Sequence, residues 1–160
     1  MAKLTVLGIG NILMRDEGVG VHLVEAVRVA RDWPEDVEFI DGGAGGLNLL
    51  TVIERAERLV VFDAAEMNLP AGTSRVVGTD QVRDETARER LSLHDAPFVE
   101  TLRLCEQFLR APEEVVIFAV QPAEVDHGRR LSPALGKAFD KLTREAVQLV
   151  ERIRKPASET

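Results

Sequence analysis

Acidic side chains follow three consecutive apolar segments of this chain, and this placement suits the binding of a cation. Asp16 and Glu17 come after the first segment, Asp41 after the second and Asp63 after the third. Ligands of open α/β sheets bind outside the carboxyl ends of the strands, so parallel strands would bring these acids to one edge. Singly, each has a structural alternative: Asp16 could be the N-cap of the next helix, and Asp41 could cap a turn. Their coincidence at one edge favours a shared site.

A histidine adds a nitrogen ligand to this set. His94 stands just before Pro97, where a helix is expected to begin. As a single residue it could be a capping or surface histidine. The dipole at a helix N-terminus, however, disfavours imidazolium and leaves a neutral ring with a free nitrogen, which is the form that binds a metal. Two carboxylates and one imidazole would suit nickel, zinc or iron(II), with coordination positions left open. His22, inside a predicted helix, and His127, in a predicted loop, are weaker candidates.

The elements that would position these residues alternate between strands and helices. Segments 3–7, 37–40, 58–62, 74–77 and 115–120 have strand character, and amphipathic segments lie between them. This alternation predicts an α/β sandwich with a largely parallel sheet. The connection 64–73 is short for a helical crossover and contains Pro70 and Gly72, so we expect an antiparallel fourth strand. Ser132 and Pro133 predict the N-cap and first turn of a long final helix that ends near Arg154.

Length and charge narrow the class of protein. The 160 residues, 45% hydrophobic and 29% charged, predict one globular domain over 1–160. A net charge of −7 without a basic stripe argues against a nucleic-acid partner. The sequence has no apolar run of transmembrane length and no signal peptide pattern, so we expect a cytoplasmic protein without a membrane partner. The single cysteine, Cys105, falls on a predicted helical stripe with Phe98, Leu102 and Leu109, which predicts a buried core residue.

Several other chemistries find no support in the pattern. The segment 8–20 is similar to a dinucleotide-binding loop, but position three after Gly10 is Leu13, and an acidic pair follows where pyrophosphate would bind. A nucleotide-binding module is therefore a disfavoured alternative. The sequence contains neither G-x-S-x-G nor H-E-x-x-H, which argues against a serine hydrolase of the α/β type and against a zincin protease.

Seven short blocks of the sequence, in this order, resemble one known family. They are GIGN at 8–11, DEGVG at 16–20, DGGAGG at 41–46, FDA at 62–64, SLH at 92–94, QP at 121–122 and LSP at 131–133. Together they resemble the hydrogenase maturation endopeptidases over nearly the whole chain. Ala44 departs from the family, which often has threonine after the paired glycines.

The resemblance implies an endopeptidase that removes a C-terminal extension from the large-subunit precursor of a nickel–iron hydrogenase after nickel insertion. It implies that Glu17, Asp63 and His94 bind the metal. It also implies a three-layer α/β/α fold with a five-stranded mixed, mostly parallel sheet whose fourth strand is antiparallel. The connection length between the third and fourth strands gives the same expectation for that strand.

We expect the nickel to arrive with the precursor, held by cysteine thiolates, so that no organic cofactor and no resident metal are needed. Asp41 is the candidate general base, or it orients the substrate strand, and Gly42, Gly43 and Gly45 would let a peptide backbone approach closely. Hydrolysis driven by the metal and hydrolysis driven by carboxylates, as in an aspartyl protease, both stay open. The alternative is a non-proteolytic chaperone that checks the precursor for nickel with the same three ligands.

Overall fold

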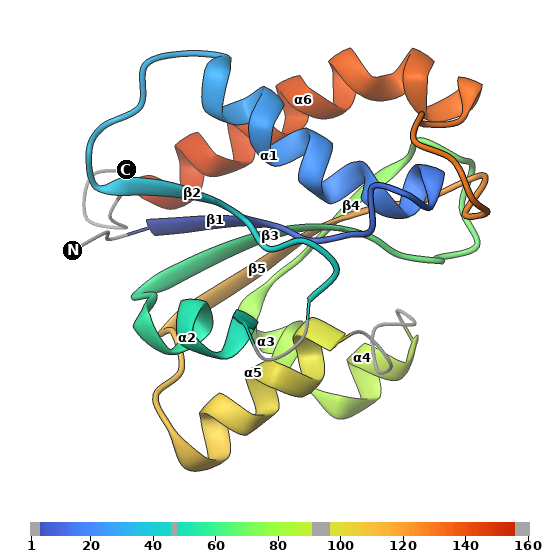
Figure 1. Cartoon of the computed structure of the whole chain (residues 1–160). Coiled ribbons are helices and arrows are strands. Elements are labelled where there is room, and N and C mark those ends of the chain that lie inside the picture. The colour runs from blue at the N-terminus through green and yellow to red at the C-terminus, as the bar shows by residue number, and fades with distance from the viewer. Residues whose placement is uncertain (1–3, 46–47, 91–96, 156–160) are drawn as a thin grey trace.

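A computed structural model describes residues 4–45, 48–90 and 97–155 and has three layers (Figure 1). A central sheet lies between α1 and α6 on one face and α2, α3, α4 and α5 on the other. The strands are β1 (Leu4–Gly8), β2 (Val37–Asp41), β3 (Arg58–Ala64), β4 (Ser74–Val77) and β5 (Glu114–Val120). The helices are α1 (Val19–Val29), α2 (Asn48–Arg55), α3 (Thr79–Arg83), α4 (Glu85–Arg90), α5 (Pro97–Phe108) and α6 (Pro133–Arg154), with a 3-10 turn, η1 (Arg15–Gly18), before α1.

The sheet has the strand order β2-β1-β3-β5-β4. β1 pairs in parallel with β2 and β3, β3 pairs in parallel with β5, and β4 pairs antiparallel with β5. The prediction of a five-stranded mixed sheet with an antiparallel fourth strand is therefore confirmed. The short connection between β3 and β4 leaves no room for a crossover helix, and the chain reverses onto the edge of β5 instead.

Two core clusters hold the layers together, one on each face of the sheet. Leu59 and Val61 of β3 belong to the cluster packed by α2 and α5, whereas Val60 and Phe62 belong to the cluster packed by α1 and α6. This alternation follows from the two-residue repeat of a strand. We call the two sides the α2–α5 face and the α1–α6 face. Because β3 is buried on both faces, its end is a rigid support for the residues that follow.

Close packing of α1 on the sheet depends on two glycines. A Cβ at Gly20 would lie 2.1 Å from the backbone oxygen of Phe62 and 2.3 Å from that of Ile9, and a Cβ at Gly8 would lie 2.4 Å from the oxygen of Gly20. Real Cβ atoms do not approach this closely. Because Gly8 and Gly20 have no side chain, the start of α1 can pack directly against the carboxyl ends of β1 and β3. The turn η1, which precedes α1, is placed there with it.

The predicted element ends are close to the observed ones, with some corrections. Ser132 caps α6 as predicted, since its Oγ accepts a hydrogen bond from the N–H of Leu135 at 3.3 Å, and α6 ends at Arg154. The sequence analysis predicts none of the short helices η1, α3 and α4. Cys105 is fully buried as predicted, but Leu109, expected on the same stripe, is 47% exposed because it lies beyond the end of α5. Within the described residues, no helix has the length and apolar character needed to cross a membrane.

Candidate active site

Asp16 and Glu17 follow β1, in η1, as predicted, whereas Asp41 and Asp63 lie within their strands rather than after them. Asp41 is the last residue of β2, and Asp63 is the second to last of β3, because both strands run longer than predicted. Asp63 is two residues after Val61 in β3, so its side chain points to the same side of the sheet as Val61, the α2–α5 face. Asp41 is two residues after Phe39 in β2, and Phe39 packs on the α1–α6 face, so Asp41 points to that face. The two carboxylates thus leave the sheet on opposite faces.

Asp63 and Glu17 are brought within electrostatic reach of each other. Burial raises the pKa of Asp63 to about 7, and the negative charge of Glu17 adds to this rise, against a hydrogen bond from the N–H of Ala64. Glu17 itself is exposed in η1. A desolvated carboxylate beside a second carboxylate is relieved either by a proton or by a cation. The pair is therefore a place where positive charge would be bound.

Asp16, next to Glu17 in the chain, has a different task. It is fully buried, and its carboxylate accepts hydrogen bonds from the backbone N–H groups of Ala123 and Glu124, both at 2.9 Å, and of Ser132 at 2.7 Å. Burial alone would raise the pKa of Asp16, but these hydrogen bonds outweigh it and hold the pKa below its ordinary value. The alternative that Asp16 caps the next helix is wrong: it binds a segment more than a hundred residues away, which no local pattern could show.

The segment 13–15 is tied to the same distant loop. Its backbone pairs with Gly128, since the N–H of Arg15 donates to the Gly128 oxygen and the N–H of Gly128 donates to the Leu13 oxygen, both at 2.9 Å. Arg15 has a φ of 45°, a conformation that non-glycine residues rarely adopt. Its side chain lies over Gly128 and forms ion pairs with Glu124 and Asp126. The backbone on both sides of Glu17 is thus held in place.

Gln121 performs a similar task for the segment after Asp63. It is 4% exposed, and its Oε1 accepts hydrogen bonds from the N–H groups of Met67, at 2.7 Å, and Leu69, at 3.2 Å. Its Nε2 donates to both carboxylate oxygens of Glu66 at 2.9 Å. In the sequence, Gln121 stands out only as part of a block that resembles the family. Its positioning role could not be seen there because its partners lie more than fifty residues away.

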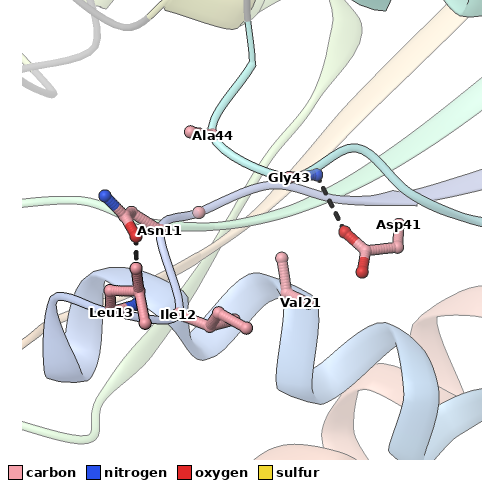
Figure 2. A pocket seen from close by; sticks show the side chains of 8 residues that line it. Asn11, Ile12, Leu13, Val21, Asp41, Gly43 and Ala44 are labelled. Carbon is pink, nitrogen blue, oxygen red and sulfur yellow. Dashed lines mark hydrogen bonds between the residues drawn. The ribbon is translucent and has the colours of Figure 1, made fainter. Parts of the chain in front are cut away.

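A pocket of about 240 Å³ lies beside Asp41 and the loop that follows β1. Figure 2 shows the residues that line it. It is lined by Gly10, Asn11, Ile12, Leu13, Val21, Asp41, Gly43 and Ala44. The Oδ1 of Asp41 accepts a hydrogen bond from the N–H of Gly43 at 2.8 Å, so Asp41 does form the turn contact that its structural alternative requires. This contact leaves the second carboxylate oxygen without a hydrogen-bond partner among the described residues.

The glycines of the predicted substrate loop differ in what they do. Gly43 has a φ of 57° and Gly45 a φ of 94°, which explains why glycine stands at both positions. A Cβ at Gly42 would lie 2.8 Å from a methyl group of Leu7, so Gly42 is required for packing. Of the three, Gly43 lines the pocket. Their binding of a substrate backbone stays a prediction.

His94 lies outside the described residues. The described chain resumes at Pro97, which opens α5, and Phe98 and Val99 pack in the same core cluster as Val61, on the face toward which Asp63 points. Within the described ranges, no group of three histidine, cysteine, aspartate or glutamate side chains is arranged to hold a metal ion. The role of Glu17, Asp63 and His94 as ligands therefore stays a prediction.

Cys105 does not supply a nucleophile. Burial raises the pKa of its thiol, and the negative charges of Glu54 and Glu106 raise it further. The reactive thiolate is therefore disfavoured. This leaves the carboxylates at the edge of the sheet as the candidates for the chemistry.

The chain is similar to several known proteins. The chain is 39% identical over 132 residues to the hydrogenase expression/formation protein HupD of Bradyrhizobium diazoefficiens, covering 82% of this chain and 69% of that one. It is 30% identical over 139 residues to the hydrogenase 2 maturation protease of Escherichia coli, covering 83% of this chain and 81% of that one. Among solved structures, the hydrogenase maturating endopeptidase HybD from E. coli matches with a TM-score of 0.73 and 25% identity over the full length of both chains.

A family model described as hydrogenase maturation protease matches residues 21–149, which is most of the chain. The fold, the relatives and the family model agree. The chain belongs to the hydrogenase maturation protease family.

Proposed function

We propose that this endopeptidase removes a C-terminal extension from the large-subunit precursor of a nickel–iron hydrogenase, and that it acts once nickel has been inserted. The names of its relatives, among them a hydrogenase maturation protease and a hydrogenase maturating endopeptidase, support peptide cleavage during hydrogenase maturation. The observation that supports recognition of nickel is the pair formed by Glu17 and Asp63. These two carboxylates lie close enough for the charge of Glu17 to raise the pKa of Asp63, and a cation relieves that repulsion.

In this proposal the nickel is part of the substrate. Cysteine thiolates of the precursor hold it, and Glu17, Asp63 and His94 of the protease complete its coordination. Docking therefore depends on the metal, because without it the approaching precursor would meet one half-buried and one exposed carboxylate with no compensating charge. The precursor's scissile segment is then held beside the carboxyl edge of the sheet.

Asp41 is our candidate for the acid–base step of hydrolysis. A water adds its oxygen to the scissile carbonyl carbon, the carbon–nitrogen bond breaks, and the amine leaves with a proton. A carboxylate that accepts the proton of the water and returns it to the amine satisfies this balance. Asp41 is exposed, its Oδ1 is fixed by Gly43, and its second oxygen is available. The same oxygen could instead orient the substrate strand by accepting one of its N–H groups.

The test is incubation of candidate precursors, with and without nickel, followed by intact mass measurement. We expect a loss of mass only for the nickel-loaded precursor, and no loss with Glu17→Gln or His94→Ala. Glu35→Gln is the matched control, since Glu35 is an exposed glutamate that precedes β2, at the opposite end of that strand from Asp41. Equal cleavage of nickel-free precursor would refute nickel recognition. Binding of the loaded precursor without any cleavage would instead identify a nickel-checking chaperone.

A further inference from the structure

We infer that the pocket between the loops 10–13 and 41–44 binds an apolar side chain of the precursor segment that contains the scissile bond. This inference rests on the proposed function and adds to it a place and a chemical preference for the substrate. The occupant is an extended peptide, not a cofactor and not a second copy of this chain.

The walls of the pocket are apolar and partly open to solvent. Four of its eight lining residues have apolar side chains, Ile12, Leu13, Val21 and Ala44, and Asp41 lines it as well (Figure 2). Ile12 is 46% exposed and Leu13 is 52% exposed, so two large apolar side chains stay in contact with water in the free protein. Covering them on binding would be favourable. The pocket thus offers binding energy that the free protein does not use.

The size of the pocket favours a side chain over a small molecule. Pockets for cofactors and drug-sized ligands measure roughly 300–1,000 Å³, and this one measures about 240 Å³. It is therefore large enough for one or two apolar side chains of a peptide. Its polar groups, a carboxylate and an amide, stand at the edge, where the backbone of such a peptide would pass.

The loop that lines the pocket packs against the backbone next to the carboxylate pair. A Cβ at Gly10 would lie 2.0 Å from the backbone oxygen of Glu17, and a Cβ at Gly18 would lie 2.7 Å from the Cα of Ile12. The loop that forms one wall of the pocket is thus packed directly against the backbone of Glu17. A peptide bound near Glu17 therefore lies next to the loop that forms this wall.

The pocket is also preformed on its backbone side. The N–H of Gly10 donates to the oxygen of Gly43 at 2.7 Å, and the N–H of Gly42 donates to the oxygen of Gly8 at 2.8 Å, so the two loops are joined. The space beside Gly43 is open, because a Cβ there would meet no atom within 4 Å. A peptide backbone can therefore approach Gly43 and donate an N–H to the second oxygen of Asp41.

The test fills the pocket and removes its apolar rim. We expect Ala44→Trp and Leu13→Asp to raise the KM for nickel-loaded precursor about 10- to 100-fold, the effect of losing one buried apolar side chain, while kcat falls much less. Leu109→Asp is the matched control: Leu109 is 47% exposed, close to the exposure of Leu13, but follows α5 at the opposite edge of the sheet. An unchanged KM for both pocket variants would overturn the inference.

A second measurement separates this inference from the proposed function. The photo-cross-linking residue p-benzoylphenylalanine is placed at position 44 and, as a control, at position 109, and the cross-links to nickel-loaded precursor are mapped by mass spectrometry. We expect position 44 to label the C-terminal segment near the cut and position 109 not to do so. Labelling of the folded body alone, or no labelling, overturns the inference. If the wild-type protein cleaves no precursor, the proposed function fails, and the cross-link still decides whether the pocket binds this segment.

Discussion

Replacing Asp63 with asparagine should stabilise the protein above pH 7 while abolishing its action on nickel-loaded precursor. The pKa of Asp63 is raised from 3.8 to about 7, chiefly by burial and further by Glu17. The folded state therefore binds this proton more tightly than the unfolded state, so the free energy of unfolding falls as pH rises from about 4 to about 7 and stays low above that. Asparagine carries no charge and removes this loss.

The magnitude follows from the pKa values. Each pKa unit corresponds to about 1.36 kcal/mol, so a rise from 3.8 to about 7 destabilises the protein by at most about 4 kcal/mol at pH 8. Part of the Asp63 residue is in contact with solvent. Solvent screening therefore reduces the destabilisation, and we expect about 2 kcal/mol. Below pH 4 the carboxyl is protonated in both states, and the wild type and the variant should have similar stability.

The assay is urea unfolding of the wild type and Asp63→Asn at pH 5 and at pH 8. We expect the difference between the two proteins to grow from pH 5 to pH 8 in favour of the variant. Asp32→Asn is the control, because Asp32 is exposed and its substitution should change stability little at either pH. A variant that is no more stable than the wild type at pH 8 would refute the argument that Asp63 is held in a desolvated, like-charged position.

Three further predictions follow from the same structure. Asp16→Asn should lower the free energy of unfolding by about 2–4 kcal/mol at pH 7, because an amide N–H₂ would face backbone donors. This cost should fade below pH 4, and a cost that stays constant in urea titrations down to pH 3 would contradict the prediction. Gly20→Ala should prevent stable folding, because the new Cβ would lie 2.1 and 2.3 Å from two backbone oxygens. Gly136→Ala in α6, where a Cβ meets no atom within 4 Å, should raise the unfolding free energy by about 0.5–1 kcal/mol. Similar melting temperatures for the two variants would show that α1 can move off the sheet. Asp41→Asn should keep precursor binding and lose most single-turnover cleavage, while full-rate cleavage would leave Asp41 as a turn residue.

Much of the fold could be predicted because its signals are local. The alternation of apolar and amphipathic segments predicts the strands, and the short connection before Ser74 predicts the antiparallel pairing of β4. The short helices η1, α3 and α4, of four to six residues, could not be found in this way. A helix of one or two turns does not repeat its apolar stripe, so periodicity gives no signal for it.

The candidate site could be predicted only in part. Strand ends indicate which acids gather at the edge of the sheet, but charge alone does not separate Asp16 from Glu17. The family resemblance favours Glu17, and the structure supplies a physical reason: the carboxylate of Asp16 is occupied by three backbone N–H groups from Ala123, Glu124 and Ser132. Those partners are distant in sequence, so no reading of the segment 8–20 could have found them. The opposite directions of Asp41 and Asp63 likewise depend on strand ends that were predicted one or two residues short.

The arrangement of these acids explains how a like-charged pair can persist in a folded protein. Holding Asp63 desolvated beside Glu17 costs roughly 2–4 kcal/mol at neutral pH. Hydrogen bonds to a charged group contribute roughly 1.5–3 kcal/mol each, and the carboxylate of Asp16 accepts three of them from the loop that follows β5. These three hydrogen bonds outweigh the cost of burying Asp16, and they act on the residue next to Glu17. Asp16 is thus held by backbone N–H groups, whereas Glu17 is exposed and lies near enough to raise the pKa of Asp63.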